Sequence, residues 1–464
     1  MGGLYRQMTF ARFLLALALP LALAGCDCGP GGHDGGVDAG HPTDAGIPDG
    51  GWCALPNTML HQGSLLHQEP SGDSHLTWLN IPDGYCAHQF ASVGNARAMR
   101  FAPTGELFVS SPTTGTTGGG LGGQAGIVLF ADDDANGVAD QLVPWRVGSL
   151  KSTQGMLFAN DGHFYFQDHT KVMREPYVPG QRQPSHDPDQ VADVQAFVDP
   201  LHWPKTLDQA EDGTIFVSNG GSQSEICDLS LPFHGGVLAL DSSASNGVTQ
   251  VAKGMRNPMY VRCHHDGHNL CFANELAKDY SADKGGREKL LPIHQGDDWG
   301  YPCCASNKLP YSDVCLTCSA QTESVGNSTP ACMTAGMCSP NCDAVQPDDN
   351  AFLIGNTPFG FDFIDAQFPP PWNNQVIVAL HGEFASWAAA KVVAIAMDPS
   401  TGLPMPSSTV TGAPLGAQQD FLTGWDDGKL DHGRPSDVVV SNDGRLFVSN
   451  DVTGEIFWVA PINP

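Results

Sequence analysis

The sequence has few basic residues: 22 lysines and arginines stand against 50 aspartates and glutamates, a formal net charge of −28. An acidic surface of this kind repels phosphate backbones, so the composition predicts no nucleic-acid partner. After the first 25 residues, no stretch is long and apolar enough to span a bilayer. Helical periodicity of useful length is also missing from the body of the chain, which favours an all-β domain.

The N-terminal residues have the pattern of an export signal. Two arginines precede an apolar run, residues 13–24, that is too short for a spanning helix and ends in Leu-Ala-Gly-Cys. This end resembles the lipobox of bacterial lipoproteins. We therefore expect residues 1–25 to be a signal peptide and Cys26 to be lipidated, which would hold the exported protein on a membrane, on the periplasmic or cell-surface side. Ordinary secretion, with Cys26 as a bystander, is the alternative.

A segment rich in glycine and aspartate follows, at residues 26–51. It contains almost no large apolar side chains and cannot bury enough surface to offset the entropy of the chain. We interpret it as a flexible acidic tether between the membrane and the folded body.

Fourteen cysteines in an exported chain predict disulfides. Cys53 and Cys86 are candidates for a bridge near the start of the body, and Cys263 and Cys271 flank a short predicted hairpin. Seven more cysteines lie between positions 303 and 342, and Cys227 could provide an eighth partner. The Cys-Leu-Thr-Cys at 315–318 could suggest zinc, but no second pair stands at ribbon spacing, and we prefer a disulfide knot of open connectivity.

One pattern recurs along the body: an apolar alternation, a turn that ends in glycine, and a dense β-type run. Its turn glycines are Gly105, Gly162, Gly213, Gly267 and Gly444. The first four are separated by 57, 51 and 54 residues, and the gap of 177 residues before Gly444 has room for one more unit. Residues 359–382 fit that place, with a longer turn rich in proline. The sequence thus contains six units.

Units of about 50 residues, each with a hairpin and room for two more strands, are typical of propeller blades. We predict that residues 52–464 form a six-bladed β-propeller. The extra length between the fourth and fifth units coincides with the cysteine-rich stretch at 300–346, which we interpret as a surface insertion outside the blades.

In a propeller, the residues just before the inner strands converge on one mouth of the central channel. Read unit by unit, these positions hold the following residues: Arg97, Gln154, His202, Lys205, Arg256, Asn257, Asn356 and Arg434, with His381 at a neighbouring strand end. Four of the six units place a basic residue there, in a protein with few of them. This local inversion of charge predicts a site for a polyanionic ligand.

Five segments resemble a known family in matching order between about residues 95 and 460. They are PLHWPKTLDQAEDGTIFVSNGG, GMRNPMYV, GDDWGYP, VALHGEF and HGRPSDVVVSNDGRLFVSND. They are similar to segments of the sorbosone- and pyranose-type sugar dehydrogenases. Those enzymes are six-bladed propellers that hold pyrroloquinoline quinone (PQQ) and Ca²⁺ over the channel mouth.

The resemblance implies a quinone-dependent oxidation of a sugar or polyol, with an electron acceptor that the sequence does not identify. His202 would take the proton of the substrate hydroxyl, a role that suits an imidazole. Arg256 and Asn257 would hold the quinone oxygens, and Arg256 would thereby also be a catalytic residue. The remaining cofactor contacts would come from Gln154, Lys205, His381 and Arg434.

The chain departs from the family pattern at several of these positions. Lys205 replaces an arginine, so a bidentate fork is lost. Glu383 and Phe384 replace a Ser-Trp pair, and the acidic stretch after the fourth hairpin differs from the segment that provides backbone oxygens to calcium. An inactive descendant of the family is the alternative that these differences leave open.

A separate calcium candidate is the segment DDDANGVAD, in which Asp132, Asp134, Asn136 and Asp140 alternate around a glycine turn. It lacks the later bidentate glutamate of a complete loop, so an acidic turn without metal is the other interpretation. The histidines 264, 265 and 268 fall on a predicted hairpin tip, where we expect them to be solvated turn residues.

Two other functions stay open at this point. A propeller hydrolase of the lactonase type would need carboxylates at the channel mouth, whereas the pattern places cationic and amide side chains there. A non-catalytic, surface-anchored binding module would need none of them.

Overall fold

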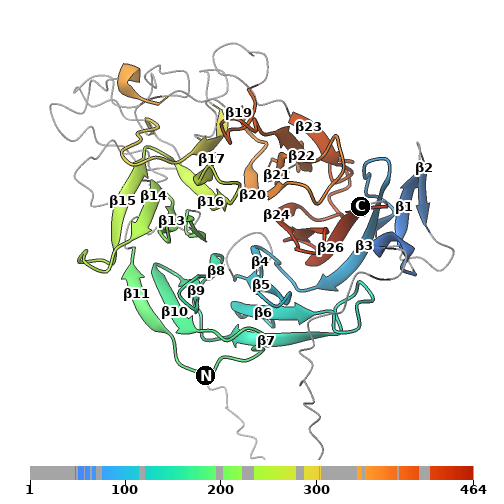
Figure 1. Ribbon diagram of the computed structural model, residues 1–464, viewed down its shortest axis with the longest axis horizontal. Coiled ribbons are helices and arrows are strands. Elements are labelled where there is room, and N and C mark those ends of the chain that lie inside the picture. Colours follow the sequence, from blue (N-terminus) through green and yellow to red (C-terminus); the bar gives the residue numbers. More distant parts are fainter. Residues whose placement is uncertain are drawn as a thin grey trace, which may run out of the picture. The chain divides into compact units, whose positions relative to one another are not determined.

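The computed structural model describes residues 48, 51–56, 58–62, 65–68, 76–113, 121–194, 202–221, 235–277, 287–301, 304, 342–346, 351–383, 386–406 and 418–462. The strands form six antiparallel sheets that lie round a central channel (Figure 1). The prediction of an all-β, six-bladed propeller is confirmed.

The first three blades contain four strands each, numbered outwards from the channel. Blade one is β4 (Met99–Phe101), β5 (Leu107–Ser111), β6 (Gly126–Ala131) and β7 (Gln141–Val147). Blade two is β8 (Met156–Phe158), β9 (His163–Asp168), β10 (Lys171–Pro176) and β11 (Asp189–Asp193). Blade three is β12 (Leu207–Gln209), β13 (Ile215–Asn219), β14 (Gly236–Leu240) and β15 (Val248–Lys253).

Blades four and five repeat this order. Blade four is β16 (Asn257–His264), β17 (Leu270–Leu276), β18 (Glu288–Pro292) and β19 (Ala351–Phe352). Blade five is β20 (Pro358–Ile364), β21 (Gln375–Leu380), β22 (Lys391–Ala396) and β23 (Gln418–Leu422).

Blade six combines both ends of the body. It is β24 (Pro435–Val440), β25 (Leu446–Asn450), β26 (Glu455–Pro461) and β3 (Tyr85–Ser92), extended by β1 (Met59–Gln62) and β2 (Leu65–Gln68). Because β3 pairs with β26, early and late parts of the chain close the ring together. A disulfide between Cys53, in the short 3₁₀ helix η1 (Trp52–Ala54), and Cys86 fastens the start of the body to β3, as expected.

The six inner strands contact one another in ring order, from β4 through β8, β12, β16 and β20 to β24 and back to β4. Each begins a hairpin, and the five turn glycines singled out in the sequence have positive φ between 80° and 98°. These φ values explain the choice of glycine, which has no Cβ to clash there.

The hydrophobic core lies between neighbouring blades. Phe108 of β5 packs on Phe164 of β9, for example, with their ring centroids 5.3 Å apart. Strands in the middle of a blade are buried on both faces, as in β21, where all six residues are buried. The strands therefore read as dense apolar runs.

Between residues 300 and 346, the described residues contain only the short helix η4 (Cys342–Ala344) and no blade strand. Cys304 and Cys342 form a disulfide in this segment, and Cys263 and Cys271 form another across β16 and β17. Cys227, the Cys315–Cys318 pair, Cys26 and nearly all of the tether lie outside the described residues. Within the described part of the chain, no helix is long and apolar enough to cross a membrane.

Candidate active site

The predicted site residues stand where the chain passes into each inner strand. Arg97, Gln154 and Lys205 come two residues before β4, β8 and β12, and Arg434 comes one residue before β24. Asn257 is the first residue of β16. Because all six inner strands start from the same end of the channel, these positions share one mouth.

Two glycines bring His202 close to Arg256 and Asn257. The Nδ1 atom of His202 lies 2.7 Å from the carbonyl oxygen of Gly221, whose own N–H donates to the carbonyl oxygen of Arg256. A Cβ added at Gly220 would lie 2.5 Å from the carbonyl oxygen of His202 and 3.1 Å from Oδ1 of Asn257. Only glycine allows so close an approach.

The contact with Gly221 also sets the tautomer of His202. A carbonyl oxygen can only accept a hydrogen bond, so Nδ1 carries the proton and Nε2 is the basic nitrogen of the neutral ring. The side chain of His202 is buried at the mouth. The structure thus places an imidazole that donates from Nδ1 beside Arg256 and Asn257.

Gln167 joins the second and third blades at the mouth. Its side-chain oxygen accepts hydrogen bonds from the backbone N–H groups of Gln154 and Lys205, both at 3.1 Å. Its amide nitrogen donates to the carbonyl oxygen of Trp203. Gln167 is fully buried, and it holds Gln154 next to the segment that carries His202 and Lys205.

On the other side of the mouth, the buried carboxylate of Asp451 contacts side chains from two other segments of the chain. Asp451 lies 3.0 Å from Nε2 of His381 and 3.0 Å from a guanidinium nitrogen of Arg97. Arg434 donates from Nε to the carbonyl oxygen of His381 and from Nη2 to that of Gly382. We call Arg97, His381, Arg434 and Asp451 the Asp451 cluster.

Burial determines the charge of several of these groups. It lowers the pKa of Lys205 to about 8, although Asp193 opposes the shift. It also lowers the pKa of His381 to about 3, with help from Arg434, so this ring is neutral near pH 7. Burial lowers the pKa of Arg434 to about 10, which leaves it charged.

Asp451 shows the opposite balance. Its burial disfavours the charged form, but His381 and Arg97 outweigh that cost and lower the pKa to about 2. The Asp451 cluster therefore contains two guanidinium groups, one carboxylate and one neutral imidazole near pH 7. Its net positive charge agrees with the polyanion site predicted from the sequence.

Ion pairs cross the channel away from the mouth. Arg262 of β16 pairs with Asp437 of β24 at 3.1 Å, and Arg100 of β4 pairs with Asp208 of β12 at 3.2 Å. In each case the partners skip one blade. These contacts fix the inner strands to one another below the residues that line the mouth.

The Asp132 segment lies elsewhere, in the hairpin between β6 and β7 of blade one. Oxygen atoms of Asp132, Asp134 and Asp140 come within 4.8 Å of one another. Their oxygens already accept hydrogen bonds from the turn itself, since Asp132 binds the N–H groups of Asn136 and Gly137. The calcium assignment for this turn stays a prediction.

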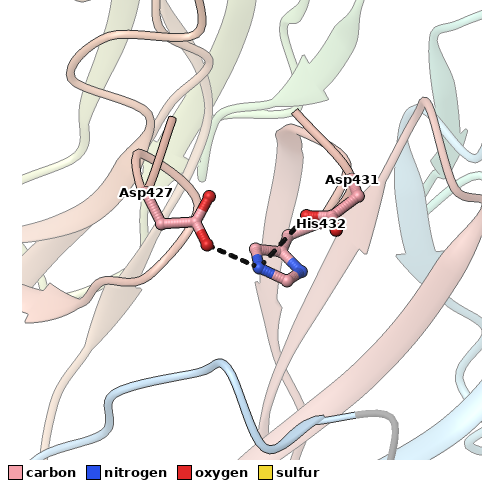
Figure 2. A group of neighbouring side chains, drawn as sticks. All are labelled: Asp427, Asp431 and His432. Carbon is pink, nitrogen blue, oxygen red and sulfur yellow. Dashed lines mark hydrogen bonds and ion pairs between the residues drawn. The ribbon is translucent and has the colours of Figure 1, made fainter. Parts of the chain in front are cut away.

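A second group with ligand-type side chains lies in the loop between β23 and β24. His432 Nε2 is 3.1 Å from Asp427 and 3.3 Å from Asp431 (Figure 2). The imidazole stacks on Trp78, with ring centroids 4.6 Å apart, and Lys429 pairs with Asp427. These contacts hold the loop that leads into Arg434.

The expectation for one of the hairpin histidines was wrong. His264 is buried rather than solvated: its ring stacks on Phe363 at 4.1 Å, and its Nε2 lies 3.0 Å from Asp365. The aromatic side chain and the carboxylate come from blade five. A pattern within one hairpin cannot reveal partners from the neighbouring blade.

Sequence reasoning missed Asp451, Gln167 and Phe359. The ring of His381 stacks on Phe359 at 4.0 Å, and the guanidinium of Arg97 lies 5.3 Å from the same ring. The sequence contained one signal for Asp451. Blades three and six both have a strand that ends in Ser-Asn; in blade three the next residue is Gly220, whereas in blade six it is the charged Asp451.

No protein-family model matches the chain, and no curated protein does. Solved structures match most of it. The calcium structure of the carbohydrate-active family AA12 protein of Trichoderma reesei is 18% identical, with 82% of this chain and 97% of that chain covered and a TM-score of 0.61. The holo form of the pyranose dehydrogenase PQQ domain from Coprinopsis cinerea is 15% identical, with 82% and 97% covered and a TM-score of 0.62.

A glucose dehydrogenase is 14% identical, with 81% of this chain and 99% of that chain covered and a TM-score of 0.54. The chain has the fold of these proteins. At such low identity the likeness extends to the fold alone, and the chemistry has to be argued from the residues at the mouth.

Proposed function

We propose that the protein is a PQQ-dependent dehydrogenase that oxidises a hydroxyl group of a sugar or polyol at the channel mouth. The observation that carries this proposal is the position of His202. Its Nδ1 is bound to a carbonyl oxygen, its ring is buried, and it lies beside Arg256 and Asn257. A base next to fixed donors suits the removal of a hydroxyl proton as a hydride leaves the same carbon.

When bound, PQQ would supply the hydride acceptor, which protein side chains lack. The protein would do the rest. His202 would take the hydroxyl proton on Nε2, while Arg256 and Asn257 would bind oxygen atoms on which negative charge develops. Lys205, Arg434 and His381 would help to hold the anionic cofactor. Two of the nitrogens of Arg434 bind the chain itself, so this residue can offer only part of its guanidinium.

Unsatisfied polar atoms support a ligand at this mouth. Within the part of the chain that the structure describes, neither side-chain atom of the Gln154 amide has a hydrogen-bond partner, and neither does Oδ1 of Asn257. Both residues are buried, and leaving a buried polar atom unpaired costs about 1–3 kcal/mol. A polar ligand that reorders these side chains would remove that cost.

Calcium is part of the proposal through the resemblance. The segment that the resemblance assigns to backbone calcium ligands falls mainly on residues 278–286, outside the described residues. The Asp132 turn is a separate candidate in blade one. Calcium dependence therefore has to be measured together with PQQ.

The deciding experiment is reconstitution of the purified protein with PQQ and Ca²⁺, followed by reduction of an artificial dye with a panel of sugars. We expect dye reduction that needs PQQ, a sugar and the intact protein. Lactone hydrolysis that needs Ca²⁺ but no PQQ would instead indicate a hydrolase. Sugar binding without turnover, by a protein that does not bind PQQ, would indicate a binding module.

We also propose that the protein is exported and anchored to a membrane by lipid at Cys26. The support is the apolar run that ends in Leu-Ala-Gly-Cys and the disulfides of the body, since disulfides persist outside the cytosol. The oxidation would then take place on the outer side of that membrane, with an electron acceptor that can reach it.

A further inference from the structure

Asp451 occupies a position from which it can control an imidazole at the mouth. It follows β25, is fully buried, and its Oδ2 atom lies 3.0 Å from Nε2 of His381. The same oxygen lies 3.0 Å from a guanidinium nitrogen of Arg97. An ionised carboxylate can only accept hydrogen bonds, so the proton of the neutral His381 ring is on Nε2.

The ring of His381 is fixed in other ways as well. It stacks on Phe359 at 4.0 Å, with an angle of 9° between the planes. Its backbone N–H donates to the carbonyl oxygen of Thr357, and its own carbonyl oxygen accepts from Arg434. With Nε2 protonated, Nδ1 is the accepting nitrogen, and it makes no hydrogen bond to the residues that the structure describes.

We propose that Asp451 is a positioning residue that keeps the proton of His381 on Nε2, so that Nδ1 accepts a hydrogen bond from an N–H or O–H group of the ligand at the mouth. This inference rests on the proposed function, because PQQ is the ligand with which it is tested. It adds to that function the role of Asp451, which the sequence analysis did not single out as a site residue, and it gives His381 an accepting rather than a donating role.

The same chain contains a matched pair that lacks this role. His264 also stacks on a phenylalanine of β20, Phe363, and its Nε2 lies 3.0 Å from Asp365. Its Nδ1, however, lies 3.2 Å from a second carboxylate, that of Asp266. His264 ends β16, at the far end of the strand from Asn257 and the mouth, so no ligand there would meet it.

The test is Asp451→Ala, which removes the accepting oxygen that Nε2 of His381 shares with Arg97. Arg97 remains and can only donate, so Nε2 loses its acceptor and the proton of the ring moves to Nδ1. We expect ¹⁵N NMR of the apo-protein, with the His381 signals assigned by His381→Gln, to show Nε2–H in the wild type and Nδ1–H in the variant.

We expect the same variant to bind PQQ about tenfold more weakly, measured by quenching of tryptophan fluorescence, because a donor would then face a ligand donor. Asp365→Ala is the control and should change neither the His381 signals nor the affinity for PQQ.

Several results would overturn the inference. A proton on Nδ1 of His381 in the wild type would do so even if Asp451→Ala failed to fold. So would a change of tautomer with unchanged affinity, or a loss of affinity without a change of tautomer. If the wild type does not bind PQQ at all, the proposed function fails, whereas the tautomer in the apo-protein still decides whether Asp451 positions His381.

Discussion

The ammonium group of Lys205 donates a hydrogen bond to the side-chain oxygen of Asn219 over 2.9 Å. Both residues are buried, and burial lowers the pKa of Lys205 to about 8. A lysine loses its charge as the pH rises through its pKa. The mouth therefore loses one positive charge just above neutral pH.

Affinity for PQQ should accordingly fall as the pH rises from about 7 to 9. Lys205→Arg should remove this dependence, because a guanidinium stays charged throughout. Fluorescence titration of the apo-protein at several pH values measures both. Lys391→Arg, which changes a partly exposed lysine paired with Asp420, is the control and should keep the wild-type pH dependence. A wild-type affinity that is constant up to pH 9 would contradict the role of Lys205.

His202→Ala should lower turnover far more than it lowers the affinity for PQQ. A general base typically contributes a factor of about 10²–10⁴ to the rate. Arg434→Ala should do the reverse, because a lost charge-assisted contact costs about 1.5–3 kcal/mol of binding. Steady-state kinetics with saturating PQQ and direct binding to the apo-protein separate the two effects.

Two surface variants serve as controls for that comparison. His163→Ala and Arg182→Ala remove side chains of the same types from partly exposed positions with carboxylate partners. Both should leave turnover and PQQ affinity unchanged. If His202→Ala and Arg434→Ala changed turnover and affinity equally, the two roles would be wrongly assigned.

Lys289→Met should destabilise the protein strongly. Lys289 is buried and pairs with the buried carboxylate of Glu275 at 2.8 Å, and Glu275 also accepts the backbone N–H of Arg256. Removing one partner of a buried ion pair typically costs about 3–5 kcal/mol. Lys391→Met breaks a surface pair and should cost about 0–1 kcal/mol. Chemical denaturation of both variants gives the two free energies of unfolding, and similar values would contradict the prediction.

Cys26→Ala should abolish lipidation. The variant should lose a metabolic fatty-acid label and leave the membrane fraction of the cells that make it. Cys28→Ala, two residues further along the tether, is the matched control and should keep both. A Cys26→Ala protein that stays in the membrane with its N-terminus uncleaved would show instead that the apolar run is the anchor.

The fold could be predicted because it repeats. The turn glycines recur at intervals close to 50 residues, and the five blades that contain one have the same positive-φ backbone conformation at that turn. The fifth unit lacks the glycine, and it was found only from the size of the gap before Gly444. The pairing of β3 with β26 had no local signal, because it joins segments at opposite ends of the body.

The sequence could predict only those site residues whose place in the blade repeat is enough to bring them to the mouth. Residues just before inner strands reach the mouth in any propeller, which identified Arg97, Gln154, Lys205 and Arg434. Which partners they find depends on three-dimensional packing. Asp451 binds His381 across 70 residues of sequence, and the accepting oxygen of Gln167 could not be foreseen from either segment that it joins.

The disulfide between Cys53 and Cys86 has a mechanical consequence if the chain is held at Cys26. A force applied to the tether would not be transmitted through residues 54–85, because the disulfide transmits it from Cys53 directly to Cys86, the second residue of β3. The hairpin of β1 and β2 would remain unloaded. The force would reach blade six at the strand that closes the ring. A reducing agent would add to the tether the segment between the two cysteines, which have a sequence separation of 33.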